Sequence, residues 1–401
     1  MMTSVELFAG VGGLALGVSR AGFKHLAVIE RDKDACETIR ENQRLGLEPV
    51  AGWPLRQVDV RSFDFGGLGE DIDLLAAGVP CQPWSIGGKH RGYDDERNLF
   101  PETVAAIRAL RPKAILMENV KGLLRESFAK YFEYITLMVA HPEVTRKGAE
   151  TWGDHRTRLE RHHTAGRERG LEYNVVFDLL NAADYGVAQR RERVFLVAFR
   201  SDLRIAWSFP RPTHTHDALL VDQWVTHEYW QRHGVPANRR PKAPARIQRR
   251  IERASSLLPL DRPWRTVRDS IADLPDPERP DRIVSNHEFN RGARPYPGHT
   301  GSPLDEPAKT LKAGDHGVPG GENMLRLPGG RVRYFTVRES ARLQSFPDAF
   351  LFHGSWTETM RQLGNAVPVQ LAEVIASDIK LHLLPDRSRL HAGRNTLQSA
   401  R

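Results

Sequence analysis

Cys81 is the residue whose surroundings best suit it to chemistry. It follows the apolar stretch Ile72–Val79 and lies between Pro80 and the pair Gln82-Pro83. A cysteine in a polar loop, near backbone N–H groups or a cation, is easily deprotonated, and its thiolate is a nucleophile. A structural cysteine more often lies inside a strand, where it packs as a small apolar side chain. The position of Cys81 therefore favours nucleophilic catalysis.

A carboxylate and two arginines follow further along the chain. Glu118 ends the apolar stretch that begins at Lys113, and there it can hold or donate a proton while a thiolate adds to an electrophilic ring. Arg191 and Arg193 share one face of an expected strand, because side chains alternate along a strand. They can bind a base carbonyl, a phosphate or Glu118 itself through paired hydrogen bonds. A helix cap for Glu118 and a surface ion-pair ladder for the arginines are the structural alternatives.

The glycines after the first apolar run are typical of a cofactor-binding turn. Gly10-x-Gly12-x-x-Ala15 is followed about twenty residues later by Glu30, which matches the dinucleotide-binding pattern. The turn lets the backbone approach a ligand, and the carboxylate accepts hydrogen bonds from ribose hydroxyls. This spacing does not distinguish NAD, FAD and S-adenosylmethionine. A nicotinamide-dependent dehydrogenase, or a turn that only packs a helix on a strand, remains open at this point.

Short apolar runs in the first 200 residues predict strands, and segments of helical spacing such as Asp34–Asn42 and Glu102–Leu110 separate them. The predicted strands are Val5–Phe8, His25–Ile29, Gln57–Val60, Ile72–Val79, Lys113–Met117, Asn174–Leu180 and Arg193–Phe199. This alternation is typical of an α/β fold with a doubly wound, mostly parallel sheet covered on both faces. Ligands bind such a sheet beyond the carboxyl ends of its strands. Because the glycine turn, Glu30, Asp59, Cys81 and Glu118 all follow strands, we expect one shared cleft.

The composition limits the classes of protein to which the chain can belong. Of its 401 residues, 40% are hydrophobic and 27% are charged, which suffices for ordinary folded cores. Cys36 and Cys81 are the only cysteines, so a disulfide scaffold and a cysteine-based zinc site are excluded. We expect neither a membrane span nor a secretory leader, and hence a cytoplasmic protein. The net charge of +8 favours a polyanionic partner.

Residues 201–300 are rich in proline, which disfavours long helices and central strands and predicts a smaller, irregular domain. Seven basic side chains in its middle predict a surface that contacts phosphates, with a solvated helix face as the alternative. They are Arg239, Arg240, Lys242, Arg246, Arg249, Arg250 and Arg253. The segment His141–Gly170 is highly charged and holds four histidines, but their spacing matches no known ligand pattern. We therefore expect a surface insertion there and no metal.

Six motifs, taken in this order, resemble those of the DNA (cytosine-5) methyltransferases of bacterial restriction-modification type. The motifs are Glu6–Gly13, Gly78–Ser85, Glu118–Val120, Gln189–Arg193, Arg338–Pro347 and Gly364–Pro368. The resemblance implies the fold of the S-adenosylmethionine-dependent methyltransferases. It leaves residues 210–300 unmatched, and in that family this interval holds the domain that recognises the target DNA.

The resemblance implies roles for individual residues. Cys81 would attack carbon 6 of a flipped-out cytosine, Glu118 would bind ring nitrogen 3, and Arg191 and Arg193 would hold the base. S-adenosylmethionine would contact Phe8, Gly10, Gly12, Gly13, Glu30, Asp59, Val60, Pro80, Leu99, Asn365 and Ala366. DNA would contact Gln82, Ser85, Arg239, Arg240, Lys242, Arg249 and Arg250.

The resemblance also implies a division of the chain. Residues 1–205 would form the catalytic and cofactor-binding domain, completed by 361–384, residues 206–335 the target-recognition domain, 336–360 a hinge and 385–401 a disordered tail. The implied partners are double-stranded DNA and a cognate restriction endonuclease acting on the same site, and the implied state is a monomer. An RNA methyltransferase, a catalytically silent DNA-binding relative and the nicotinamide enzyme are the alternatives. The last of these leaves Cys81 and Glu118 without a role.

Overall fold

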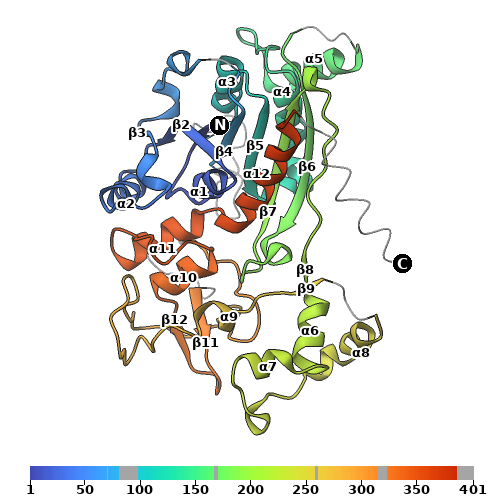
Figure 1. The fold of residues 1–401 in the computed structure, drawn as a ribbon. Helices are drawn as coiled ribbons and strands as arrows, with labels where there is room; N and C mark the ends of the chain where they lie inside the picture. The colour runs from blue at the N-terminus through green and yellow to red at the C-terminus, as the bar shows by residue number, and fades with distance from the viewer. Residues whose placement is uncertain (70, 81–97, 167–169, 258–260, 314–322, 386–401) are drawn as a thin grey trace.

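The larger lobe of the molecule is built on a seven-stranded sheet with the order β3-β2-β1-β4-β5-β7-β6 (Figure 1). The computed structural model describes residues 1–69, 71–80, 98–166, 170–257, 261–313 and 323–385. The strands are β1 Met2–Leu7, β2 Phe23–Glu30, β3 Leu55–Gln57, β4 Leu74–Gly78, β5 Ala114–Val120, β6 Tyr173–Asn181 and β7 Glu192–Arg200. Pairing is parallel from β3 through β5, whereas β7 runs antiparallel to both β5 and β6. The sheet is thus mostly parallel, as the sequence predicts.

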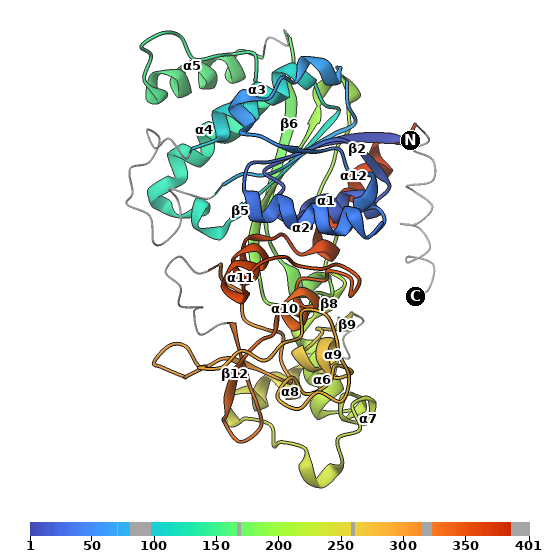
Figure 2. The same ribbon diagram turned by 90° about the vertical axis from the view of Figure 1, so that its left-hand side faces the viewer.

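Helices cover both faces of this sheet (Figures 1 and 2). On one face lie α1 (Gly13–Arg20) and α12 (Val369–Leu383), whose apolar side chains share a core with Leu74 and Ala76 of β4. On the other face lie α3 (Phe100–Leu110) and α4 (Ala129–Ala140), which pack on the intervening residues of the same strands. A helix layer on each face confirms the doubly wound fold.

The last helix lies against the first one, although more than 340 residues separate them in the chain. Gly17 of α1 permits this approach, since a Cβ there would lie 2.4 Å from the Cβ of Ala372 and 2.7 Å from the carbonyl oxygen of Val369. The C-terminal segment therefore packs into the sheet domain. The two helices that precede α12 in the chain, α10 (Val337–Leu343) and α11 (Trp356–Asn365), lie between the two lobes (Figure 1).

The strand order reverses between β1 and β4, because the chain winds outward from these two strands in opposite directions. Loops that diverge at such a reversal leave a crevice beyond the carboxyl ends of the strands. Leu7 of β1 pairs with Ala77 of β4 at this edge. The residues that come next, Phe8 and Val79, therefore border the crevice.

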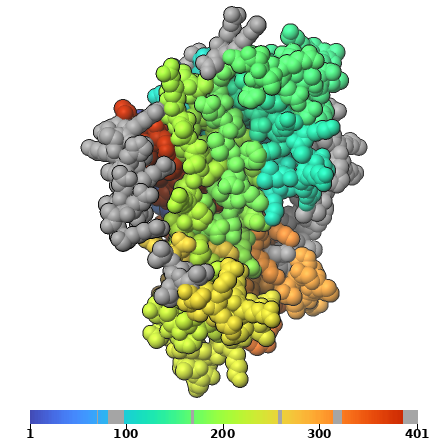
Figure 3. Space-filling view, turned by 90° about the vertical axis from the view of Figure 1, so that its right-hand side faces the viewer, coloured from blue at the N-terminus to red at the C-terminus, as the bar shows by residue number. Residues whose placement is uncertain are grey.

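The second lobe consists of short elements, of which α6 and α7 pack around a small core of Leu219, Tyr229 and Trp230. Val267 of α9 and Leu325 of β11 instead pack in a core shared with the sheet domain. Its helices are α6 His216–Trp224, α7 Glu228–Arg232, α8 Gln248–Leu257 and α9 Val267–Ile271. Its strands are β8 His214–Thr215, β9 Arg262–Pro263, β10 Ser302–Pro303, β11 Met324–Arg326 and β12 Val332–Tyr334. The space-filling view shows this lobe beneath the sheet domain (Figure 3). Elements of at most ten residues in its described part match the high proline content.

Two segments differ from their expected structure. The predicted strand Gln57–Val60 is wrong, because β3 ends at Gln57 and the Asp59 side chain caps the turn Val60–Ser62. The segment 141–170 contains α5 (Trp152–Thr164), which begins with a capping box between Thr151 and Asp154 and buries Leu159 in the main core. The side of α5 that carries Leu159 thus belongs to the core of the sheet domain, and the segment is not only a surface insertion.

Two further expectations concern the C-terminal tail and a membrane span. Residues 386–401, most of the expected disordered tail, lie outside the described residues. None of the helices in the described ranges is both long and apolar enough to cross a membrane.

Candidate active site

A cavity of about 280 Å³ lies where the strand order reverses. Its size is near the lower end of the roughly 300–1,000 Å³ that is typical of small-molecule sites. Residues from the ends of β1 to β5 meet around it, so the shared cleft expected from the sequence is present. The lining includes Phe8, Gly10, Glu30, Asp59, Val60, Pro80, Leu99, Glu118, Arg193, Asn365 and Ala366.

Glu30 holds the turn that follows β1. Its Oε2 accepts a hydrogen bond from the backbone N–H of Gly10 at 2.7 Å, and its Oε1 accepts from the N–H groups of Arg31 and Asp32 at 2.8 and 2.7 Å. An ionised carboxylate can accept about four hydrogen bonds. One position on Oε2 therefore remains for a ligand hydroxyl, and the same side chain fixes the backbone that would surround the ligand.

Gly12 and Gly13 pack behind the wall of the cavity and do not line it. Gly12 has φ of +88°, and a Cβ there would lie 2.5 Å from the ring of Trp53. A Cβ on Gly13 would lie 2.3 Å from the carbonyl oxygen of Val367. The absence of a side chain at both positions lets the glycine turn pack between Trp53 and the Asn365–Val367 segment.

Asp59 contributes a fixed negative charge to the cavity. Its carboxylate accepts hydrogen bonds from Nε and Nη2 of Arg61 at 2.9 and 2.7 Å and from Arg31 at 3.3 Å. The Arg61 guanidinium above all holds the pKa of this carboxyl well below its usual range. Phe8 and Leu99 give the same cavity apolar walls. Apolar walls beside a polar edge suit a flat heteroaromatic ring.

Glu118 and Arg193 form an ion pair at the inner end of the cavity. The Nε of Arg193 lies 2.9 Å from Oε1 of Glu118, and the two side chains are only 12% and 9% exposed. Burial raises the pKa of the Glu118 carboxyl, while the positive charges of Arg193 and then Arg191 oppose that rise. Of the three partners considered for the arginines, Arg193 thus contacts Glu118.

Arg191 is fully buried and binds the backbone from behind the cavity. Its guanidinium donates to the carbonyl oxygens of Leu311, Gly364 and Ala366 at 3.0, 2.7 and 3.0 Å. These bonds hold the turn that carries Asn365 and Ala366, both of which line the cavity. In this structure Arg191 orients cavity residues and acts on Glu118 through its charge.

Asn119 connects the end of β5, which carries Glu118, to the segment that follows β4. Its Nδ2 donates to the carbonyl oxygen of Val79 at 3.1 Å, and its Oδ1 accepts from the backbone N–H of Val120 at 2.9 Å. The segment Val79-Pro80 is thereby tied to the end of β5, beside Glu118. Cys81 follows Pro80 in the sequence, but Cys81, Gln82 and Ser85 lie outside the described residues.

Three residues at the cavity, Asn119, Asp32 and Arg361, had no role predicted from the sequence. Asp32 and Arg361 line the cavity, and Nη2 of Arg361 donates to Oδ2 of Asp32 at 2.9 Å. This pair links α11 to the end of β2 across the rim. Two sequence features could have indicated these roles. Asn119 lies inside the Glu118–Val120 motif, and Arg361 lies just before the Gly364 turn.

The basic cluster of the second lobe is mostly exposed. Arg239, Lys242 and Arg249 are exposed, while Arg240 is partly buried and donates to the carbonyl oxygen of Val235. Arg250 is also exposed and pairs with the Asp217 carboxylate. The positive surface expected between residues 239 and 253 is thus available to a solvent-borne partner.

The seven-stranded sheet has its order reversal beside a cofactor-sized cavity and an antiparallel β7 between β5 and β6, and this is the fold class of the S-adenosylmethionine-dependent methyltransferases. Among solved structures, the S. pombe Dnmt2 methyltransferase has a similar fold, with a TM-score of 0.53 and 18% identity over 96% of this chain and 98% of that one. The Dnmt2 protein of Spodoptera frugiperda gives a TM-score of 0.54 at 15% identity over 95% of this chain and 100% of that one.

The sequence comparisons identify the family. The model of the C-5 cytosine-specific DNA methylases matches residues 2–141 and 153–381. The chain is 33% identical to the Type II methyltransferase M.NgoMIV of Neisseria gonorrhoeae, over 94% of this chain and 96% of the relative. It is 31% identical to M.Eco47II of Escherichia coli, over 95% and 79%. The chain therefore belongs to the C-5 cytosine-specific DNA methylase family and is a DNA (cytosine-5-)-methyltransferase.

Proposed function

We propose that this enzyme methylates carbon 5 of a flipped-out cytosine in duplex DNA through a covalent bond between Cys81 and carbon 6. One observation carries the proposal: Glu118, the glycine turn and Pro80, which immediately precedes Cys81, all border one cavity. A nucleophile that follows Pro80 and an acid at Glu118 can then act on the same ring.

The cavity fits S-adenosylmethionine on its own chemistry. Glu30 keeps one acceptor position for a ribose hydroxyl, and Phe8, Val60 and Leu99 offer apolar walls for an adenine ring. Bound S-adenosylmethionine would supply an electrophilic methyl group on a positively charged sulfur.

The chain's own residues account for the remaining chemistry. Carbon 5 of cytosine is a poor nucleophile until the Cys81 thiolate adds to carbon 6, which moves electron density onto carbon 5 and, through carbon 4, onto nitrogen 3. Glu118 in its acid form donates a proton to nitrogen 3 and stabilises that density, which its raised pKa favours. Carbon 5 would accept the methyl group and then lose its proton to a base as the bond to Cys81 breaks. This restores the thiolate, and nitrogen 3 returns its proton to Glu118.

The substrate must reach this cavity as an extruded base, because a thiolate cannot approach the face of a stacked cytosine. Extrusion costs a few kcal/mol, which contacts with the opened duplex must offset. We assign these contacts to the second lobe with its exposed basic cluster. Because relatives such as M.NgoMIV are named Type II methyltransferases, we further propose a restriction endonuclease of the same specificity as a partner. We also propose a monomeric enzyme, because residues of one chain line the cavity on the glycine-turn, Glu118 and Asn365 sides.

A mechanism-based trap tests the proposal. Target DNA that contains 5-fluorocytosine should remain attached to Cys81, since the fluorine at carbon 5 cannot leave as a proton does. Peptide mapping by mass spectrometry after incubation with S-adenosylmethionine should find the adduct on the Cys81 peptide. Because the target sequence is unknown, the DNA should be a fluorocytosine-substituted genomic fragment library, with transfer RNA as the parallel RNA substrate.

Cys36 provides the matched control. Its thiol is fully buried under α2 (Lys33–Arg44), and burial raises its pKa to about 12. Cys36→Ser should therefore trap DNA normally, whereas Cys81→Ser should form no adduct and lose turnover while binding the cofactor nearly as well as the wild type. An adduct on Cys36, or methylation by Cys81→Ser, would refute the mechanism, and an adduct with RNA alone would reassign the substrate.

A further inference from the structure

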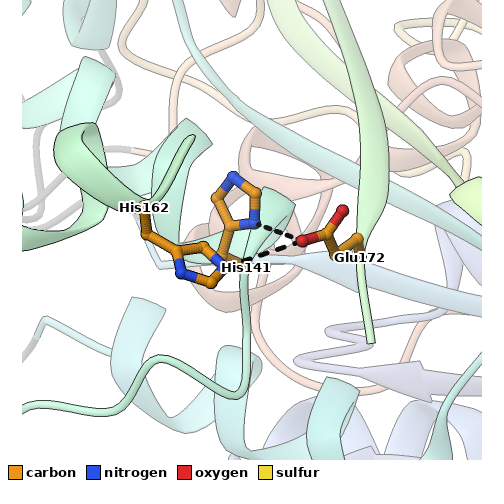
Figure 4. Close-up of side chains that lie close together, drawn as sticks. All are labelled: His141, His162 and Glu172. Carbon is orange, nitrogen blue, oxygen red and sulfur yellow. Dashed lines mark ion pairs between the residues drawn. The ribbon is translucent and has the colours of Figure 1, made fainter. Parts of the chain in front are cut away.

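Three side chains far from the active site point toward one common centre (Figure 4). His141 ends α4, His162 lies in the last turn of α5, and Glu172 immediately precedes β6. Nδ1 of His141, Nε2 of His162 and Oε1 of Glu172 all lie within 4.8 Å of one another. Three separate elements thus contribute one ligand atom each.

The distances between these atoms are those of ligands around a metal rather than of hydrogen bonds. Oε1 of Glu172 lies 3.5 Å from Nδ1 of His141 and 3.6 Å from Nε2 of His162. Hydrogen bonds between such atoms are about 2.7–3.2 Å long. Two zinc bonds of about 2.0–2.2 Å at a tetrahedral angle separate their ligand atoms by about 3.3–3.6 Å. The two distances to Glu172 therefore match those between zinc ligands, and the third, between the two imidazoles, is at most 4.8 Å.

From this geometry we propose that His141, His162 and Glu172 bind one divalent transition-metal ion, with zinc as the best match. Two imidazoles and one carboxylate form a common zinc ligand set, and a water molecule would complete the tetrahedron. The proposal reverses the expectation that this segment carries no metal. The sequence could not reveal the site, because Glu172 is separated from both histidines by the fold and the spacing matches no motif.

The state of His141 supports the proposal. Its ring is 8% exposed, and within the described residues Nδ1 has no hydrogen-bond partner. This nitrogen lies 3.5 Å from Oε1 of Glu172, beyond the usual length of a hydrogen bond. A buried imidazole with an unused nitrogen is ready to bind a cation.

His163 gives the site the outer support that metal-binding histidines usually have. Nε2 of His141 lies 2.9 Å from Nδ1 of His163, so His141 can donate its Nε2 proton there and keep Nδ1 free for the metal. Such outer partners fix the tautomer and orientation of the ligand. The His162 side chain is 30% exposed, which leaves a route by which the ion can enter.

The position of the site points to a structural role. Tyr173 pairs with Arg200 at the end of the sheet opposite the cavity, and the seven steps of β7 from Arg193 to Arg200 span roughly 23 Å. Bound metal would link the end of α4, the end of α5 and the start of β6. The loop within this link, residues 142–152, is also the part that the family model leaves unmatched.

Metal binding can be measured directly on the full chain without an affinity tag. After chelator treatment, the protein should be titrated with Zn²⁺ in competition with a chromogenic chelator, and we expect one equivalent per chain. Co²⁺ should give the intense visible bands of a four- or five-coordinate site. The Co²⁺ spectrum tests the wild-type protein and does not depend on whether a variant folds.

Substitutions then assign the ligands. His162→Gln and Glu172→Gln should weaken zinc binding at least 100-fold, and His163→Gln should weaken it about 10–100-fold as an outer partner. His353→Gln and Glu160→Gln replace exposed or half-exposed residues of the same types elsewhere and should bind like the wild type. The absence of stoichiometric Zn²⁺ binding, a Co²⁺ spectrum of hexa-aquo type, or equal affinity in the ligand and control variants would each overturn the proposal.

Discussion

Glu118 is placed between two opposing influences that together suit it to proton transfer. Burial favours its neutral acid form, whereas the Arg193 guanidinium at 2.9 Å favours the carboxylate. Neither influence removes the other, so the proton can be held and released as charge develops on the base. Replacing Glu118 with Gln should lower kcat by about 10²–10⁴, the usual contribution of such a group.

Removing the Arg193 charge should raise the pKa of Glu118 further, because only the charge of Arg191 would then oppose the effect of burial. In Arg193→Met, the pH at which the Glu118 carboxyl titrates should move upward, as followed by NMR of carbon-13-labelled glutamate with Glu118→Gln to assign the signal. Arg190→Met changes an exposed neighbour that pairs with Glu306 and should leave this pKa in place. A downward movement in Arg193→Met would contradict the assignment of Arg193 as the charge that opposes burial.

The positions of the cavity residues could be predicted from the sequence, but their contacts could not. Glu30, Asp59 and Glu118 were placed at the cavity because strand ends of a parallel sheet meet at one edge. The carbonyl oxygens that Arg191 binds come from residues 311, 364 and 366. Such long-range partners depend on tertiary packing, which strand periodicity does not encode.

Glu6 gives strand β1 an unusual buried carboxyl under α1 and α12. It shares a face with Ser4 and pairs with Ala76, whose side chain lies in the core beneath these helices. Both its oxygens lack a hydrogen-bond partner among the described residues, and burial raises its pKa well above the usual value. The folded protein therefore keeps Glu6 protonated, while the unfolded chain ionises it above about pH 4.3.

The stability cost of Glu6 should thus grow with pH. Above the unfolded pKa, each pH unit costs the wild type about 1.4 kcal/mol until the folded pKa is reached. Glu6→Gln cannot ionise, so its thermal midpoint relative to the wild type should be higher at pH 7.5 than at pH 5. Differential scanning fluorimetry at both pH values measures this, and an equal difference at the two values would show that Glu6 is not protonated in the fold.

The contact between α1 and α12 depends on Gly17. Alanine favours helices by about 1 kcal/mol over glycine, but its Cβ would lie 2.4 Å from that of Ala372. Overpacking of this kind costs about 1–3 kcal/mol, so Gly17→Ala should lower the thermal midpoint by several degrees. Gly67→Ala adds a Cβ where no atom lies within 4 Å and should leave the midpoint nearly unchanged. Equal midpoints for both variants would mean that α12 is not tightly packed on α1.

Helices and strands with a clear periodicity of apolar residues could be predicted from the sequence. Elements that depend mainly on caps and tertiary contacts could not. The expected helix Glu102–Leu110 corresponds to α3, whose apolar side chains recur with helical spacing. Helix α5 was missed because its mean composition is charged, and it is stabilised by its Thr151 cap and by the burial of Leu159. The strand placed at Gln57–Val60 was displaced because Asp59 prefers to cap a turn.

The sheet domain is discontinuous in sequence. The segment Asn365–Val367 lines the cavity and helix α12 packs on the sheet, although both follow the second lobe in the chain. Residues of the two lobes share one apolar core beside the glycine turn. Motif order predicted this return, whereas the fold of residues 210–300 followed no readable pattern beyond its proline content. The short elements of this lobe take positions that only the folded chain defines.

If the second lobe holds DNA through its basic cluster, binding must respond to salt. Each phosphate contact contributes about 0.9 to the slope of log affinity against log salt concentration. Replacing Lys242, Arg246 and Arg249 with Gln should therefore lower the magnitude of the slope by about 2–3, measured by fluorescence anisotropy on duplex DNA. Replacing Lys24, Arg161 and Arg204, which are exposed at the opposite end of the sheet, removes the same net charge and should change the slope far less. Equal slopes for both triple variants would show that net charge alone, and not the cluster on this lobe, attracts the duplex.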